Sequence, residues 1–375
     1  MFTCCTKYPI DALIHRHAVA LADRLIHDSA SLEDAQATVV QDPFSAIESA
    51  IVAIIFEICF GAASDGDQQL YSEMMHMLHE MRDVMPSVQS ADIMPWMAPL
   101  LRGKVRRYTD SIQRFDQLSI NKIDALVSAG VPDVPNCIVH ALHHACLTEA
   151  ANDVDGSMSA KIMAVVQDFI GAGSEVSVNF IHWAILYAAK YPSAVQERVR
   201  DEIRRTIGCT SVPAASDRGR MPYSEACMWE IMRHCCLSPM SIPHTVIRDA
   251  VIDGCSVTAG TVVFANFYST AWDPDVWGDP GTFRPERFLT PDGSRLDREV
   301  LSQFMRFGAG RRRCPGAQFS SLELFLFFVI LMQRCSFRAP PGHELSTDGT
   351  FVLTTQAKRY GVVVQAAAND SANVL

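Results

Sequence analysis

The sequence predicts a mainly α-helical protein with a small β subdomain near its C-terminal end. Residues 8–125 read as successive helices with few strand signals, and a further long helical pattern runs from about residue 159 to 190. Only after Pro239 do β-branched residues alternate with Asp-Gly and Ala-Gly turns, which is typical of short hairpin strands. The chain has 375 residues, of which 49% are hydrophobic, so it can bury the core of one large domain. We therefore expect residues 1–375 to form a single domain with a disordered tail at 366–375.

The amino-acid composition limits the kinds of partner and environment that we expect for this protein. The formal net charge is −10, so no face-wide excess of Lys and Arg is available and we expect no nucleic-acid partner. The cysteines are scattered through apolar runs such as IIFEICFGAA, and the first residues do not read as a signal peptide, so most cysteines are interpreted as reduced core residues. No uncharged run approaches the ~20 residues that a membrane span needs.

The first half of the chain is expected to contain helices separated by two irregular stretches. The run SAIVAIIFEICF (49–60) is apolar nearly all round and predicts a buried helix. The stretch 87–103 contains two prolines, Trp96 and several bulky apolar residues, and it predicts an exposed apolar loop that could touch a membrane surface. A second loop is predicted at 128–136, where glycine and two prolines interrupt the pattern.

The second half of the chain alternates helices with loops and short strands. Pro222 stands where the first turn of a helix would begin. We expect a charged helix over 191–208, a loop over 209–222, hairpin strands over 244–267, a loop-rich stretch over 273–291, a very apolar helix over about 317–333 and a strand pair around 349–364.

The stretch RFGAGRRRCP (306–315) places three arginines directly before Cys314, behind a glycine-rich turn. A helix is expected to begin here, and its N-terminal amides and dipole, together with the arginines, would favour a thiolate. Gly308 and Gly310 would permit a tight turn beside a planar group. Such a cysteine could be a buried core residue beside solvated arginines, a catalytic nucleophile, a redox sensor or an axial ligand to haem iron.

Residues Phe307 to Gly316 resemble, position by position, the cysteine-loop signature of the cytochrome P-450 family of haem-thiolate monooxygenases. The resemblance covers nearly the whole chain and implies the cytochrome P-450 fold, with haem b as cofactor and Cys314 as the ligand of its iron. It implies that Phe307, Gly308, Arg312 and Gly316 also contact the haem, Arg312 through a propionate.

A second motif of the family is a buried triad of charges. Glu230 and Arg233 are spaced i, i+3 on one predicted helix face, which by itself is typical of solvated surface pairs. Downstream, the run FRPERF (283–288) resembles the family segment whose arginine, here Arg287, closes the triad. Three charges held together would fix the position of the cysteine loop.

A third motif, AGSEVS (172–177), resembles the oxygen-binding groove of the family's central helix. Gly173 would leave room over the haem, and Glu175 occupies the acid position of the proton relay. Val176 stands where the family usually has threonine, so the hydroxyl of the relay is missing. Without the resemblance, Glu175 would be read as a surface acid beside a tolerated glycine.

The run SPMSIPHT (238–245) resembles the family segment along one edge of the haem pocket, where His244 would bind a propionate. Arg311 and Arg313 are expected to face solvent, where an acidic electron-donor protein would dock. Positions that match substrate-lining stretches of the family are Ile170, Ala172, Met240, Ile242, Leu353 and Thr354.

The function that the resemblance implies is insertion of one oxygen atom from O₂ into a lipophilic, steroid-like or xenobiotic-like substrate. Electrons would come from NADPH through an NADPH–cytochrome reductase-type donor. The wording of DIMPW, AGSEVS and IPHT is closest to the animal microsomal group that contains steroid 17- and 21-hydroxylases and aryl-hydrocarbon hydroxylases. Members of that group lie on the cytosolic face of the endoplasmic reticulum membrane.

Two alternatives remain open at this point. The N-terminal anchor, first strands and first helices of the family have no match here, so the chain could be a catalytically impaired haem-binding remnant or an incomplete gene model. A weaker alternative is a metal-binding interaction protein, because His140, His143 and His144 could share a helix face with Glu149 nearby. No complete set of four ligands at zinc-site spacing accompanies them.

Overall fold

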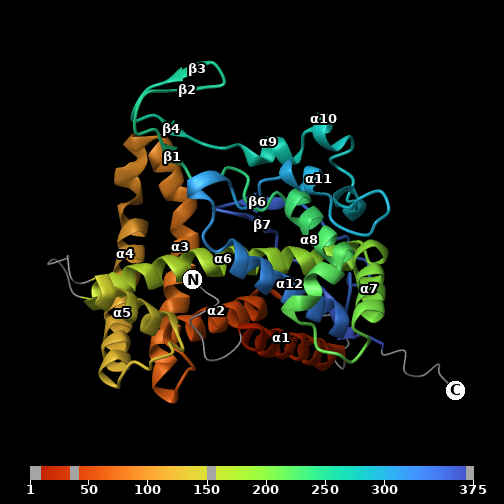
Figure 1. Ribbon diagram of the computed structural model, residues 1–375, viewed down its shortest axis with the longest axis horizontal. Helices are drawn as coiled ribbons and strands as arrows, with labels where there is room; N and C mark the ends of the chain where they lie inside the picture. The colour runs from red at the N-terminus through yellow and green to blue at the C-terminus, as the bar shows by residue number, and fades with distance from the viewer. Residues whose placement is uncertain (1–9, 34–41, 150–157, 369–375) are drawn as a thin grey trace.

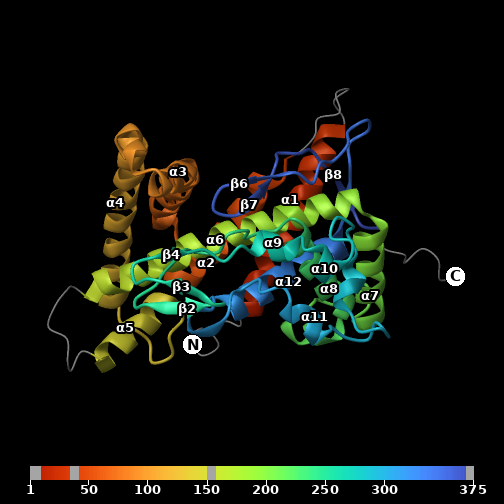
Figure 2. The ribbon, with the colours of Figure 1, turned by 90° about the horizontal axis from the view of Figure 1, so that it is seen from above.

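The computed structural model describes residues 10–33, 42–149 and 158–368. A long central helix, α6 (Met158–Lys190), runs across the molecule and the other helices pack around it (Figures 1 and 2). The prediction of a mainly α protein with a small β subdomain is confirmed. The helices that precede α6 are α1 (Ile10–Glu33), α2 (Phe44–Phe60), η2 (Asp65–Asp67), α3 (Gln68–Ile93), η3 (Pro95–Met97), α4 (Ala98–Ser128) and α5 (Ile138–Glu149).

The chain after α6 contains shorter helices and all the strands in the described residues. Pro222 opens α8, as expected. The helices are η4 (Ser193–Glu197), α7 (Arg198–Thr206), η5 (Ala215–Arg220), α8 (Pro222–His234), α9 (Phe267–Ala271), α10 (Pro274–Trp277), η6 (Pro285–Phe288), α11 (Arg298–Ser302), η7 (Gly310–Arg312) and α12 (Ala317–Arg334). The strands are β1 (His244–Thr245), β2 (Ala250–Ile252), β3 (Cys255–Val257), β4 (Val262–Val263), β5 (Cys335–Arg338), β6 (Gly349–Phe351), β7 (Thr355–Ala357) and β8 (Val363–Ala366).

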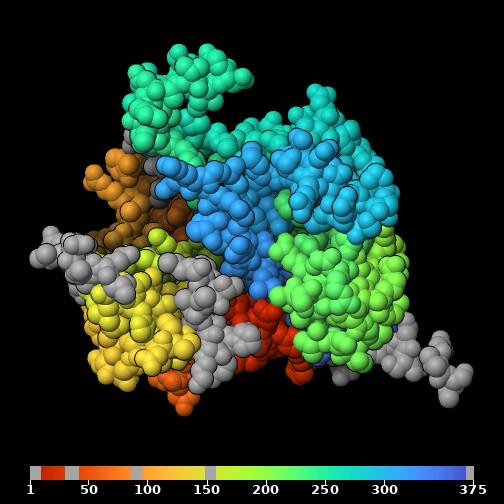
Figure 3. Space-filling view, in the orientation of Figure 1, coloured from red at the N-terminus to blue at the C-terminus, as the bar shows by residue number. Residues whose placement is uncertain are grey.

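The strands form antiparallel pairs rather than one continuous sheet. The expected hairpins are present as β2–β3, with Val251 opposite Ser256, and as β6–β7. β1 pairs with β4, and β5 pairs with β8. The sequence did not indicate β5, because its first residues continue the apolar run of α12. The β2–β3 hairpin projects from one end of the molecule (Figure 3).

Three apolar helices supply much of the core. In α2 and in the second half of α6 nearly every side chain is buried, as the apolar pattern of 49–60 predicts for α2. α12 is the third, and Phe325, Phe327 and Phe328 are almost fully buried in it. α12 is also long and apolar enough to cross a membrane, but 72% of it is buried inside the protein, which is typical of a core helix.

The structure corrects the prediction of a loop at 87–103. α3 continues to Ile93 and α4 begins at Ala98, so only a short 3₁₀ turn, η3, separates two long helices. A proline at the start of a helix is compatible with helical backbone, which is why Pro95 and Pro99 do not force a loop. The expected exposure of apolar residues is present at the tip, where Trp96 and Leu100 are 71% and 75% exposed.

Smaller differences between the predicted and the observed elements concern short helical turns. The predicted loop 209–222 contains the 3₁₀ helix η5, and the predicted helix 191–208 begins with a π-helical turn, η4, before α7. The loop 128–136 is present between α4 and α5. The predicted disordered tail lies mostly in 369–375, which is outside the described residues.

The seam between α6 and α12 contains a buried carboxyl group. The rings of Phe169 and Phe319 lie 5.8 Å apart, and farther along the seam Ser177 Oγ donates a hydrogen bond to Glu323 Oε2 at 2.6 Å. Glu323 is fully buried, and its Oε1 has no hydrogen-bond partner among the residues that the structure describes. Burial therefore raises the pKa of Glu323 to about 8, although the Ser177 hydrogen bond opposes the shift.

Glu323 should make the free energy of unfolding depend on pH. Its pKa is about 8 in the folded chain against an ordinary value of 4.5, so between these values the folded state holds a proton that the unfolded state has released. Stability should fall as pH rises, by up to about 1.4 kcal/mol per pH unit in this window. Urea denaturation from pH 5 to pH 8 should show that Glu323→Gln removes this slope.

Glu344→Gln serves as the matched control, because Glu344 is exposed. It should retain the wild-type slope. An unchanged slope in Glu323→Gln would contradict the assignment of a buried proton to this carboxyl.

Candidate functional site

Cys314 lies on an exposed loop between η7 and α12. The backbone N–H of Cys314 donates to Phe307 O at 2.9 Å, which closes the loop on itself. Gly308 (φ +69°) and Gly310 (φ +66°) both adopt the left-handed conformation that disfavours other residues, so the glycines of the motif are required by the turn. Figure 3 shows this C-terminal segment, in blue, at the molecular surface.

The helix after the cysteine begins at Ala317, where the apolar pattern predicts its start. Gly316 is its N-cap, and a Cβ placed on Gly316 would lie 3.9 Å from Cys314 Sγ. The sulfur is therefore close to the start of α12, as the sequence predicts. Arg311, Arg312 and Arg313 are all exposed on the same loop.

The triad residues Glu230, Arg233 and Arg287 lie together in the interior beside this loop. The Glu230 carboxylate accepts two hydrogen bonds of 2.8 Å from Arg233 and one of 3.1 Å from Arg287 Nε. Glu230 and Arg233 are completely buried, and the Arg287 side chain is only 5% exposed. Bidentate pairing of this kind is among the strongest charge-assisted hydrogen bonding in proteins.

Both arginines of the triad also bind backbone carbonyl groups of the loop-rich segment. Arg233 donates to Ala271 O (2.7 Å) and Pro280 O (2.9 Å). Arg287 donates to Trp277 O (3.0 Å) and Thr282 O (2.8 Å). The guanidinium groups are thus satisfied without water, which is the condition for burying them at acceptable cost.

Glu175 lies within a buried polar network rather than on a free surface. Its Oε1 accepts from Asn179 Nδ2 (2.8 Å) and from Gln356 Nε2 of β7 (2.7 Å). Its Oε2 lies 3.7 Å from Arg82 Nε of α3. Arg82 is also paired with the buried Glu48 of α2, and Glu48 in turn contacts the half-exposed His79 at 3.1 Å. The network connects Glu175 to the protein surface.

The neighbours of Glu175 on α6 do not supply a free hydroxyl donor. Val176 is half-buried and has none. Ser174 Oγ donates to Ile170 O at 2.8 Å, and Ser177 Oγ donates to Glu323. A Cβ on Gly173 would approach Ile55 Cδ1 to 3.1 Å, so this glycine lets α6 pack closely on α2.

The remaining predicted site residues differ in burial, and they form an exposed, a half-buried and a buried set. Thr354 is buried and its hydroxyl accepts a hydrogen bond from Asn179 at 3.0 Å. Their roles toward a ligand stay predictions. The exposed set is Ala172, Ile242, Leu353 and His244 of β1, the half-buried set is Met240, Phe307, Gly308 and Gly316, and Ile170 is buried.

The histidines of α5 do not assemble a metal site. His140 Nδ1 contacts Asn136 Oδ1 at 2.6 Å, and His144 Nε2 contacts Pro132 O at 3.1 Å, so both rings bind the loop before α5. Among the residues that the structure describes, no group of three or more His, Cys, Asp or Glu side chains could hold a metal ion.

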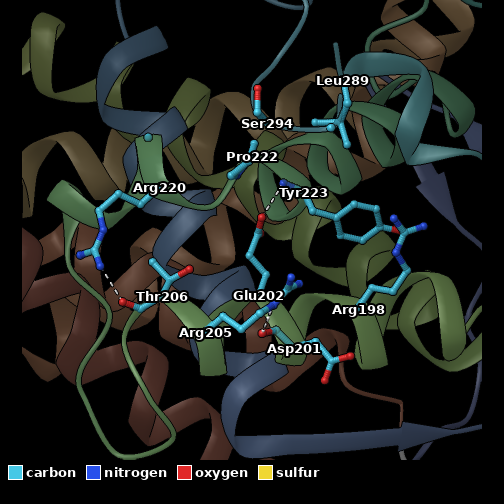
Figure 4. Close-up of a pocket in the computed structure, with 12 residues that line it drawn as sticks. Arg198, Asp201, Glu202, Arg205, Thr206, Arg220, Pro222, Tyr223, Leu289 and Ser294 are labelled. Carbon is cyan, nitrogen blue, oxygen red and sulfur yellow. Dashed lines mark hydrogen bonds between the residues drawn. The ribbon is translucent and has the colours of Figure 1, made fainter. Parts of the chain in front are cut away.

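A polar pocket of about 550 Å³ lies elsewhere, between α7, η5 and the start of α8 (Figure 4). Glu202 in this pocket accepts hydrogen bonds from the backbone N–H groups of Tyr223 (2.8 Å) and Ser224 (2.7 Å), so it caps α8. Arg198 stacks on the Tyr223 ring, with Cζ 3.9 Å from the centroid. The pocket contains none of the predicted site residues, and its charges already have partners.

Comparison with known proteins agrees with this geometry. The helical fold, the exposed cysteine on a glycine turn and the buried Glu–Arg–Arg triad are the features that the resemblance to haem-thiolate proteins led us to expect. The family model for Cytochrome P450 matches residues 15–364, and the chain belongs to that family. It is 30% identical to cytochrome P450 1A3 of Oncorhynchus mykiss over 92% of this chain and 66% of the relative, and 31% identical to cytochrome P450 1A1 of Rattus norvegicus over 85% and 61%.

The chain therefore spans slightly less than two thirds of the length of these relatives. Haem is the cofactor of the family, and the residues present fit it. Cys314 offers a single exposed thiol as iron ligand on a loop that glycines keep open. Arg312 is an exposed cation of the same loop, suited to the acidic edge of a porphyrin.

Sequence reasoning missed Glu323, Asn179, Gln356 and Arg306. Glu323 had a readable signal, since it is a lone acid inside the apolar run of α12. Gln356 had none, because its partner Glu175 lies far away in the sequence. Asn179 lies one helical turn after Glu175, but its second partner, Thr354, is equally distant.

Glu230→Gln should destabilise the protein by roughly 3–5 kcal/mol, because the two buried guanidinium groups would lose their only shared anion. Chemical denaturation measures the change directly. Glu286→Gln is the control, since Glu286 lies in the same FRPERF segment but pairs with Arg198 at the surface. That exposed pair should contribute about 0–1 kcal/mol. Equal losses in the two variants would contradict the role given to the buried triad.

Proposed function

We propose that this protein is a haem-dependent monooxygenase that inserts one oxygen atom from O₂ into a lipophilic, steroid-like or xenobiotic-like substrate. The observation that carries the proposal is the exposed Cys314, closed onto Phe307 and adjoining the start of α12. Membership of the cytochrome P450 family supports it. Electrons would originate from NADPH and arrive through a reductase-type partner.

The residues that would hold the haem are Cys314, Arg312 and His244. Cys314 would ligate the iron as thiolate, and the side chains of Arg312 and His244 would bind the propionates. When bound, the haem supplies the iron chemistry that activates O₂. The protein's contribution is to orient the ligand loop, to exclude water and to deliver protons. Ala172, Ile242 and Leu353 offer apolar surface for the substrate.

Glu175 is suited to deliver protons because it is connected to the surface. Its carboxylate is held by Asn179 and Gln356, and the ion pairs through Arg82 and Glu48 lead outward to His79. A rotation of the Glu175 side chain away from Arg82 would carry a proton inward. Glu323 is a second buried carboxyl group, and it is protonated at neutral pH because burial raises its pKa to about 8.

Two exposed surfaces suit the partners. Arg311 and Arg313 of the cysteine loop would attract an acidic electron donor. The exposed Trp96 and Leu100 at the tip of α3 and α4, near the basic Arg102, suit the interface of a membrane, which is consistent with a place on the cytosolic face of the endoplasmic reticulum.

The reduced, CO-treated absorption spectrum tests the ligand assignment. Haem-loaded wild-type protein should show the strongly red-shifted band of a thiolate-ligated ferrous–CO haem. Cys314→Ser should lose this band entirely, because the hydroxyl does not replace a thiolate as ligand. Cys209→Ser is the control, since Cys209 is also exposed, and it should keep the band. A band that survives in Cys314→Ser would exclude this cysteine as the ligand.

Val176→Thr tests the proton relay. Neither Ser174 nor Ser177 has a free hydroxyl proton to replace the missing one, so wild-type protein should lose reducing equivalents as hydrogen peroxide. General acid–base groups contribute typically about 10²–10⁴-fold, so restoring one link should raise product formed per NADPH consumed severalfold. The ratio is measured with the same substrate and reductase for both proteins. An equal or lower ratio in the variant would show that proton delivery does not depend on this position.

A further inference from the structure

Arg306 immediately precedes the cysteine loop and contacts three elements at once. Its guanidinium Cζ lies 3.7 Å from the centroid of the Trp229 indole of α8 and 4.8 Å from that of Phe307. One terminal nitrogen lies 3.4 Å from Met232 Sδ of α8, and the other lies 3.4 Å from Ser321 Oγ of α12. A single side chain therefore connects α8, the cysteine loop and α12.

A second feature of Arg306 is that its guanidinium has no anionic partner among the described residues. It forms no ion pair with any residue in the part of the chain that the structure describes, and its buried Nε has no hydrogen-bond partner. Burial, together with the nearby Arg218, lowers the pKa of Arg306 to about 9, and Glu225 opposes the shift. Arg233 and Arg287 differ, because both share the Glu230 carboxylate. The residue as a whole is half-buried, but its Nε is buried without a partner, and an unsatisfied buried polar atom costs stability, so simple packing would be served better by an apolar side chain.

The contacts connect Arg306 directly to the position of Cys314. Trp229 is itself held by Phe288 and Phe304, with ring centroids 5.9 Å and 6.3 Å away, so the indole is a fixed platform. Phe307 follows Arg306 in the chain, and its carbonyl accepts the hydrogen bond from the Cys314 N–H. The contacts that fix Arg306 on the Trp229 indole therefore also fix Phe307 O, which is the acceptor that positions Cys314.

We propose that Arg306 is a positioning residue for Cys314, which clamps the cysteine loop onto α8 through a cation–π contact with Trp229 and onto α12 through Ser321. The consequence of this clamp for iron ligation rests on the proposed haem-thiolate function. The contacts of Arg306 themselves do not depend on that function. The planar guanidinium stacks on the indole while its nitrogens reach sideways to both helices, which neither an apolar chain nor an ammonium group can do fully.

The first test uses the chain without haem. Hydrogen–deuterium exchange of the peptide that contains Cys314 reports on the bond from its N–H to Phe307 O. Arg306→Met should speed this exchange about tenfold, as expected for loss of a desolvated cation–π contact, and Arg306→Lys should recover part of the protection. Arg334→Met is the control, since Arg334 lies at the far end of α12 in an exposed pair with Asp23, and it should leave the exchange unchanged.

The second test uses the haem-loaded protein and the red-shifted ferrous–CO band. Arg306→Met should lose this band several times faster than wild type while haem content stays the same, and Trp229→Leu should behave alike. The double variant should show no further loss, since both changes remove one contact. If Arg306→Met does not fold, the hydrogen–deuterium exchange and the loss of the ferrous–CO band are measured in Arg306→Lys and Trp229→Leu instead.

The outcomes distinguish a failure of the positioning role of Arg306 from a failure of the proposed haem-thiolate function. Unchanged exchange at Cys314 in Arg306→Met and in Trp229→Leu overturns the positioning role, whatever the spectra show. Faster exchange in a chain whose wild type shows no red-shifted band supports the positioning role and overturns the proposed haem-thiolate function. Uniformly faster exchange over the whole chain, without recovery by lysine, reduces Arg306 to a general packing residue and also overturns the inference.

Discussion

The carboxylate of Glu230 is the interaction on which the architecture around the site depends. One buried anion holds two buried guanidinium groups, and these bind carbonyl oxygens of five residues from Ala271 to Thr282. That segment contains only short helices and has little regular hydrogen bonding of its own. Because the charges have no access to water, any displacement of the segment would leave a group unpaired. The segment is therefore restricted to one position relative to α8.

The cysteine loop is placed by the same helix. α8 presents Glu230 and Arg233 toward the loop-rich segment, and it presents Trp229 and Met232 toward Arg306 at the start of the cysteine loop. On the other side, α12 adjoins the sulfur through Gly316 and packs on α6 through the Phe169–Phe319 pair. The cysteine loop thus packs against one frame formed by α6, α8 and α12.

Polar groups in this frame are distributed unevenly along α6. Glu175 and Asn179 turn toward β7 and α3, where they find partners from distant parts of the sequence. Ser177 turns toward α12 and meets Glu323. Val176, between them, has no polar group, so the two buried carboxyl groups, Glu175 and Glu323, have no hydroxyl of residue 176 to join them. This arrangement identifies the protein's own departure from the pattern of its family.

Local signals in the sequence determined the helices, the hairpins and the identity of the candidate ligand. Continuous apolar runs predicted α2 and α12, and a long helical pattern predicted α6. Turn glycines predicted the β2–β3 hairpin, and Gly308 and Gly310 predicted the tight turn before Cys314. Local signals misassigned 87–103, because prolines are compatible with both a loop and the start of a helix. Only the tertiary structure decided which partner each of these titratable side chains contacts. Glu175 contacts Gln356, Glu323 contacts Ser177, and Arg306 contacts an indole instead of an anion. These contacts join residues that are far apart in the chain, and their energies depend on exclusion of water, which the order of residues does not reveal.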